Sequence, residues 1–116
     1  MLFIEYPKCS TCQKAKQWLI DNGIEFADRN IKEQNPNYDE LKEWYARSGL
    51  ELKRFFNTSG LLYKSMNLKD RLPEMSEDEQ LKLLASDGML VKRPLIITDK
   101  AILTGFREKE WAEKLL

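Results

Sequence analysis

The sequence predicts an α/β fold in which a β-α-β unit at the start and a β-β-α unit at the end enclose a helical insert. Three observations indicate this class: a short apolar run leads directly into an amphipathic helix, helix-capping signals recur through the middle, and an apolar hairpin precedes a final helix. The chain has 116 residues, of which 42% are hydrophobic and 33% charged. A chain of this size and composition can bury a core without disulfides.

The opening of the chain is typical of a β-α-β unit. Apolar residues dominate positions 2–6, and Pro7 ends this strand because proline cannot donate to a β-ladder. Apolar side chains at helical spacing predict a helix over 11–22, and Gly23 provides the left-handed residue that ends it. Alternation of apolar and polar residues over 25–31 predicts a second strand.

The middle of the chain carries two capping boxes, each of which marks the start of a helix. Asn37 is followed three residues later by Glu40, and the helix that begins there ends at Gly49. Ser76 and Glu79 repeat the pattern for a later helix.

Between and after these helices the signals are shorter. Residues 52–56 predict a single helical turn, the polar stretch 57–60 predicts a break, and 61–68 predicts a further helix. The Asp-Gly pair at 87–88 ends the last helix of the insert.

The end of the chain predicts an antiparallel hairpin and a helix. Pro94 precedes an apolar strand at 95–98, a tight turn follows at 99–100, and a second strand covers 101–104. Amphipathic residues 108–116 then form the last helix.

In chain order these elements match a thioredoxin-like fold with a helical insertion of approximately residues 37–90. The insert is too short and too closely tied to the sheet to form a domain of its own. Neither an internal repeat nor a linker interrupts the chain. We therefore expect one thioredoxin-like domain over residues 1–116.

Composition excludes several classes of function. The chain has no histidine, so Ser-His-Asp and Cys-His nucleophiles, histidine metal sites and imidazole pH switches are absent. Nineteen basic residues balance nineteen acidic ones, which argues against direct binding of nucleic acid. Two cysteines can build neither a four-thiolate zinc site nor the disulfide framework of a small secreted module, so we expect no metal and a reducing compartment. With no long apolar run and no signal peptide, we expect a cytoplasmic protein without membrane contact.

The strongest chemical signal is the pair Cys9 and Cys12, located where the first strand turns into the first helix. Free amide N–H groups of the opening helical turn point at the first sulfur and favour its anion. Such a thiol has a pKa of about 3.5–7.5 instead of about 8.5, which makes Cys9 the candidate nucleophile. Cys12 lies on the same helical face within disulfide reach and faces fewer free amides, so it is the candidate resolving thiol. Ser10 and Thr11 supply amides and hydroxyls that bind an anion, cap the helix, or do both.

Two other interpretations of the cysteines stay open at this point. Free cysteine is among the most buried residue types, so both could be small core residues. The pair could also provide two ligands of a metal shared across a dimer.

Three motifs carry a resemblance to a known family; they read YPKCSTCQKA, KRPL and TGFR at residues 6–15, 92–95 and 104–107. Together they resemble the ArsC family, which contains arsenate reductases and the Spx-type regulators, and the resemblance spans nearly the whole chain. It implies a thioredoxin-type fold with a helical insert and a catalytic cysteine at Cys9. It also implies a cis peptide bond between Arg93 and Pro94.

The resemblance further implies an anion site, because three arginines hold the oxyanion in arsenate reductases of this type. Arg93 matches one of them and Arg107 matches another, although helix capping and solvation explain Arg107 equally well. The third position falls near Asn57, whose amide forms a weaker hydrogen bond than a guanidinium; a polar turn is the other interpretation of this residue. Cys12 is a second departure, since the glutathione-dependent enzymes usually lack a cysteine at this position. A second cysteine here resembles the pattern of the Spx branch, or of enzymes with a dithiol mechanism.

The leading hypothesis is a thiol-dependent reductase of the arsenate reductase type, acting on a small oxyanion or a disulfide. Cys9 would attack the substrate, Arg93 would stabilise the anion, and Cys12 would close a Cys9–Cys12 disulfide. Glutathione, glutaredoxin or thioredoxin would then reduce that disulfide from outside, so no bound cofactor is expected. The alternative is an Spx-like regulator that binds RNA polymerase and uses the two cysteines as a redox switch. A third possibility is a family member that retains only a structural role.

Overall fold

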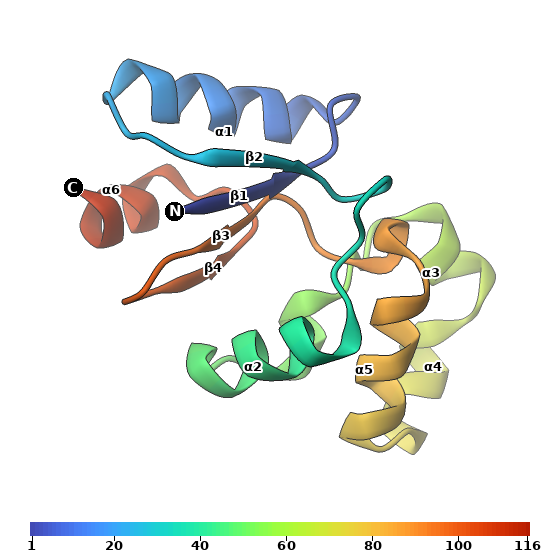
Figure 1. The fold of residues 1–116 in the computed structure, drawn as a ribbon. Helices are drawn as coiled ribbons and strands as arrows, with labels where there is room; N and C mark the ends of the chain where they lie inside the picture. Colours follow the sequence, from blue (N-terminus) through green and yellow to red (C-terminus); the bar gives the residue numbers. More distant parts are fainter.

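A four-stranded sheet forms the centre of the computed structural model, which describes all residues 1–116 (Figure 1). The strand order is β2-β1-β3-β4, and the strands are β1 (Leu2–Glu5), β2 (Ala27–Asn30), β3 (Leu95–Ile97) and β4 (Ile102–Thr104). β1 pairs in parallel with β2, while β3 pairs antiparallel with both β1 and β4. The predicted β-α-β and β-β-α units are therefore confirmed and meet along β1 and β3.

Each face of the sheet has its own core, because neighbouring side chains on a strand point to opposite faces. One face packs against α1 (Ser10–Asp21) and α6 (Glu108–Leu115) in a core made of Phe3, Ala15, Leu19, Ile96, Leu103 and Trp111. The other face packs against the insert, and the sheet contributes Ile4, Leu95 and Ile102 to that core. Figure 1 shows α1 lying along the sheet on the side away from the insert, which is drawn in green to orange.

The insert contains α-helices and short 3₁₀ turns. The helices are α2 (Tyr38–Ser48), α3 (Leu61–Ser65), α4 (Leu68–Arg71) and α5 (Glu77–Ser86), and the turns span Leu52–Phe55, Leu72–Glu74 and Gly88–Leu90. Both predicted capping boxes form. The Glu40 amide donates to the Asn37 side chain at 2.9 Å, and the Glu79 amide donates to Ser76 Oγ at 3.1 Å.

The prediction of one helix over 61–68 is wrong, because the chain breaks between α3 and α4. Asn67 has a φ of 54°, in the left-handed region. Asparagine tolerates this conformation because its short side chain can form local hydrogen bonds. The other predicted helices and strands are present, with ends that differ by one or two residues from the sequence-based ranges.

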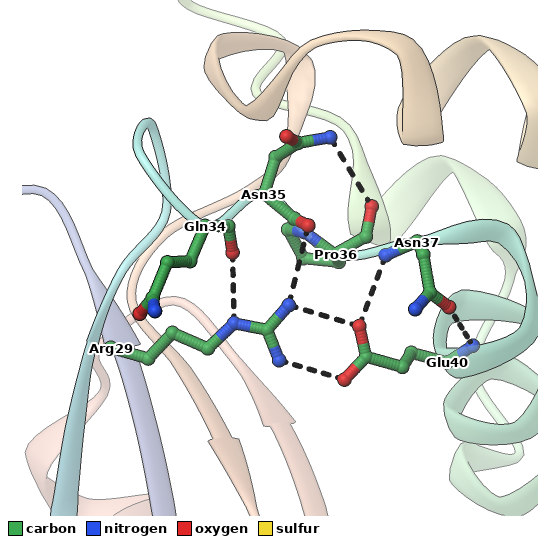
Figure 2. Close-up of polar contacts among 6 residues, drawn as sticks. All are labelled: Arg29, Gln34, Asn35, Pro36, Asn37 and Glu40. Carbon is green, nitrogen blue, oxygen red and sulfur yellow. Dashed lines mark hydrogen bonds and ion pairs between the residues drawn. The ribbon is translucent and has the colours of Figure 1, made fainter.

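Arg29 joins the sheet to the insert (Figure 2). Its guanidinium forms a two-pronged ion pair with Glu40 of α2, at 2.7 and 2.9 Å. It also donates to the carbonyl oxygens of Gln34 at 2.8 Å and Asn35 at 3.2 Å. Because Glu40 is also part of the capping box with Asn37, one carboxylate both starts α2 and ties it to β2.

The molecule measures 42 × 28 × 24 Å, and its Cα radius of gyration is 13.8 Å. The longest helix, α1, has 12 residues. None of the helices combines the length and apolar character that crossing a bilayer requires.

Candidate functional site

A tight turn places Cys9 at the start of α1. The Cys9 amide donates to the Tyr6 carbonyl at 3.0 Å, which closes a four-residue turn with Pro7 at its second position, where proline is favoured. Cys9 is the N-cap of α1, with φ −89° and ψ 122°, and its carbonyl accepts the Gln13 amide at 3.1 Å. The half-buried sulfur therefore faces the free amides of the first helical turn, as the sequence predicted.

The surroundings of Cys9 favour its thiolate. Partial burial alone would raise the pKa of the Cys9 thiol. Hydrogen bonds from the amides of Cys12 and Thr11, from the Cys12 thiol and from the Arg93 guanidinium outweigh that burial, so the pKa lies below its ordinary value. The shift increases the fraction of thiolate, which is the nucleophilic form of cysteine.

Cys12 titrates in the opposite direction. Its side chain is buried, and burial together with the nearby charges of Cys9 and Glu5 raises the pKa of the Cys12 thiol to about 12. Both cysteines are free thiols. The two thiols therefore differ in acidity, and Cys9 is the more readily ionised of the pair.

An ion-pair network with one buried member, Glu5, lies near Cys12, and sequence reasoning missed it. Glu5 at the end of β1 is 3% exposed, and burial raises the pKa of its carboxyl. Lys16, one turn after Cys12 on α1, reaches Glu5 at 3.6 Å and Asp28 at 2.8 Å. The only sequence signal was an acidic residue inside the apolar run of the first strand.

Arg93 lies beside the sulfur of Cys9. The peptide bond between Arg93 and Pro94 is cis, and the Pro94 carbonyl accepts the Gly105 amide at 2.8 Å. The guanidinium carbon of Arg93 lies 5.3 Å from the centre of the Tyr6 ring, in a cation-π contact. The side chain is therefore held between an aromatic ring and the cysteine sulfur.

These groups open into a cleft of about 700 Å³ lined by 17 residues. The cleft brings together five residues that the sequence analysis selected: Cys9, Thr11, Asn57, Arg93 and Arg107. Ser10, Cys12 and Pro94 do not line it. No group of three or more His, Cys, Asp or Glu side chains forms a metal-binding cluster.

The lining of the cleft is strongly basic although the whole chain has a formal net charge of zero. Its one acidic residue is Glu51, and its cations are Lys53, Arg54, Lys92, Arg93 and Arg107. Arg54 was missed by the sequence analysis, which placed the third arginine position at Asn57 without an arginine. Three arginines nonetheless line the cleft. Arg54 precedes Asn57 by three residues and belongs to the 3₁₀ turn Leu52–Phe55, so its closeness to Asn57 in sequence was the available signal.

Asn57 both lines the cleft and holds the turn that follows it. The backbone amide of Asn57 donates to the Leu90 carbonyl at 2.8 Å, and the backbone carbonyl of Asn57 accepts from the Gly60 amide at 3.1 Å. A Cβ atom on Gly60 would lie 2.6 Å from Asn57 Nδ2. Asn57 therefore takes part in the polar turn and also lines the cleft.

The fold and the cleft are those of a thioredoxin-like protein built around a cysteine thiol. The sequence profile of the ArsC family matches residues 4–114. The chain belongs to the ArsC family, and it is an arsenate reductase-like protein of the thiol-based kind.

Known proteins of two kinds resemble this chain. The uncharacterized protein YusI of Bacillus subtilis is 54% identical over 97% of this chain and 96% of its own length. The regulatory protein MgsR of the same species is 30% identical over 95% of this chain and 86% of its own length. The global transcriptional regulator Spx of Enterococcus faecalis is 30% identical over 90% of this chain and 77% of its own length.

Solved structures extend this similarity. An ArsC family related protein from Bacteroides fragilis has a TM-score of 0.94 and 54% identity, covering 97% of this chain and 94% of that one. An arsenate reductase from Vibrio cholerae has a TM-score of 0.84 and 28% identity, and the match covers 99% of this chain and 96% of that one. The family therefore includes both enzymes and regulators among the relatives of this chain.

Proposed function

We propose that the protein is a thiol-dependent reductase in which Cys9 attacks an oxidised substrate. The observation that carries this proposal is the Cys9 sulfur at the N-terminus of α1, in contact with Arg93 and open to a basic cleft. A low-pKa thiol that is accessible and next to a guanidinium is the environment of a reactive cysteine.

In the first step the Cys9 thiolate attacks the oxidised atom of the substrate. With arsenate, a sulfur–arsenic bond forms and one arsenate oxygen leaves as water after protonation. Arg54, Arg93 and Arg107 line the cleft and would offset the negative charge of the oxyanion. With a disulfide, Cys9 bonds to one sulfur and the other leaves as a thiolate.

In the second step Cys12 attacks the Cys9 sulfur and closes a Cys9–Cys12 disulfide. The bond between Cys9 and arsenic breaks, its electron pair stays on arsenic, and arsenite is released. The charge of Cys9 helps to raise the pKa of Cys12. Once Cys9 is bonded to the substrate this charge is gone, which removes one of the factors that raise the pKa of Cys12.

An external thiol completes the cycle by reducing the Cys9–Cys12 disulfide. Glutathione, glutaredoxin or thioredoxin would supply the two electrons, and no bound cofactor takes part. The proposal implies a cytoplasmic setting, because that compartment keeps these donors reduced.

The test is a coupled assay of the purified protein with arsenate. Either glutathione with glutaredoxin and its reductase, or thioredoxin with its reductase, serves as the donor, and NADPH consumption is followed. We expect Cys9→Ser to abolish turnover and Cys12→Ser to leave a mixed adduct on Cys9 that mass spectrometry detects. Equal loss of activity in both variants without an adduct would contradict these roles.

A second candidate function is an Spx-like regulator that binds RNA polymerase. It is favoured by the relatives named Spx, of which the chain spans 76–78%, and by the second cysteine. Retention of RNA polymerase by the immobilised protein under only one redox condition, without turnover in the coupled assay, would favour this function.

A further inference from the structure

Two buried polar atoms in the cleft have no hydrogen-bond partner. They are Nη1 of Arg93 and the hydroxyl oxygen of Thr104, a residue that is 3% exposed. Buried polar atoms in folded proteins are almost always paired, and an unpaired one destabilises the protein. Both residues line the same cleft, so a ligand that enters it can satisfy both atoms.

The sheet places Arg93 and Thr104 near each other. Thr104 ends β4 and pairs with Leu95 of β3. One residue further along, the Gly105 amide donates to the Pro94 carbonyl at 2.8 Å. Arg93 and Thr104 thus lie at the same end of two adjacent strands, and both line the cleft.

The chemistry of the two atoms defines what would pair with them. Nη1 of Arg93 can only donate a hydrogen bond, and the hydroxyl of Thr104 can donate one. The same guanidinium also contacts the Tyr6 ring and the Cys9 sulfur. An oxygen that accepts from both, next to three arginines, is an anionic oxygen.

We propose that Thr104 is a substrate-binding residue that holds, together with Arg93, one oxygen of an anionic substrate beside Cys9. This inference rests on the proposed function, since it concerns the same cleft. The anionic oxygen belongs to a tetrahedral oxyanion or to the carboxylate of a peptide thiol.

The test compares Thr104→Val, which removes the hydroxyl at similar size, with the matched control Thr104→Ser, which keeps it. Two unreactive probes separate the sources of the oxygen: inorganic phosphate and S-methylglutathione, which has carboxylates and no reactive sulfur. Affinities are measured by calorimetric titration in a buffer without other oxyanions, and thermal unfolding without probe checks that each variant folds.

We expect Thr104→Val to bind one of the probes about 10-fold more weakly than wild type, the effect of losing one hydrogen bond to a charged group. Thr104→Ser should bind that probe with an affinity within about 3-fold of wild type, a smaller change than the loss of one hydrogen bond to a charged group would cause. Without probe, Thr104→Val should unfold at the same temperature as wild type or higher, because it removes an unpaired buried hydroxyl.

The probe whose binding is weakened identifies the source of the oxygen. Equal binding of both probes by wild type and Thr104→Val, equal weakening by Thr104→Val and Thr104→Ser, or no binding of either probe by wild type would each overturn the inference. None of these measurements requires turnover, so the outcome is independent of whether the reductase assay succeeds.

Discussion

Cys9 and Cys12 are identical side chains three residues apart whose pKa values shift in opposite directions. The shift at Cys9 comes from donors that converge on its sulfur, and the shift at Cys12 comes from burial. The position of Cys9 before a helix was readable from local sequence, because amides that lack intrahelical partners follow from the helix start itself. Arg54 and Thr104 were not readable in this way, because their place in the cleft depends on how distant segments pack.

At this scale we predict that Arg93→Gln raises the pKa of Cys9. The guanidinium favours the thiolate, so its loss favours the protonated thiol and moves the midpoint of reactivity to higher pH. The rate of alkylation by iodoacetamide, measured against pH, reports this midpoint. Arg71→Gln, an exposed arginine outside the cleft, is the control and should leave the midpoint in place.

A backbone contact predicts a second effect at the residue scale. A Cβ atom on Gly88 would lie 1.8 Å from the Ile31 carbonyl oxygen, so Gly88→Ala forces two backbone segments apart. We expect a loss of about 3 kcal/mol or more in the free energy of unfolding, measured by urea denaturation. Gly60→Ala is the comparison, because its close neighbour is the end of the Asn57 side chain. A smaller loss at Gly88 than at Gly60 would contradict this account.

At the scale of elements, most helix starts and strands were predictable because their signals are local. The two capping boxes use side chains and amides within one turn, and both form as predicted. The break at Asn67 was not predictable, since the sequence around it continues a helical pattern. The Arg29–Glu40 pair was also missed, because it joins two elements through a loop.

This ion pair leads to a prediction about pH. The Arg29 guanidinium holds the pKa of Glu40 below its ordinary value. The stabilisation is therefore complete above the unfolded carboxyl pKa of about 4.3 and is lost as pH falls through the lower folded value. We expect Arg29→Met to lower the free energy of unfolding by about 1–3 kcal/mol at neutral pH, and by less in acid.

Urea denaturation at neutral and acid pH measures both quantities. The control is Lys82→Met, which removes the exposed Lys82–Asp78 pair within α5. Exposed pairs of this kind contribute little, so this variant should be close to wild type. A pH-independent effect of Arg29→Met would show that packing, and not the ion pair, is responsible.

At the scale of the whole molecule, zero net charge conceals an uneven distribution. The balance of charges in the composition argued against nucleic-acid binding, yet five cations line one cleft. Composition reports a sum, and only the fold determines where each charge lies. The fold class was predictable because the order of the elements is visible in the sequence. The residues that line the cleft were predictable only in part, because they come together only when the chain folds.

This distribution predicts a preference of Cys9 for anionic reagents. Iodoacetate should alkylate Cys9 faster, relative to neutral iodoacetamide, than it alkylates a cysteine in a short peptide. The preference should decrease as salt rises, because the screening length is about 8 Å at physiological ionic strength. Arg54→Gln should reduce it, whereas Lys69→Gln, outside the cleft, should not. A preference that is independent of salt would argue against an electrostatic origin.

The cleft draws Cys9 from the first strand-helix junction, Arg54 from the insert, and Arg93 and Arg107 from the last quarter of the chain. During synthesis the cysteine leaves the ribosome long before those arginines do. Until Arg93 has emerged and the chain has folded, the Cys9 sulfur lacks the hydrogen bond from this guanidinium. Because this hydrogen bond favours the thiolate, the pKa of Cys9 is fully lowered only after the last quarter of the chain has folded.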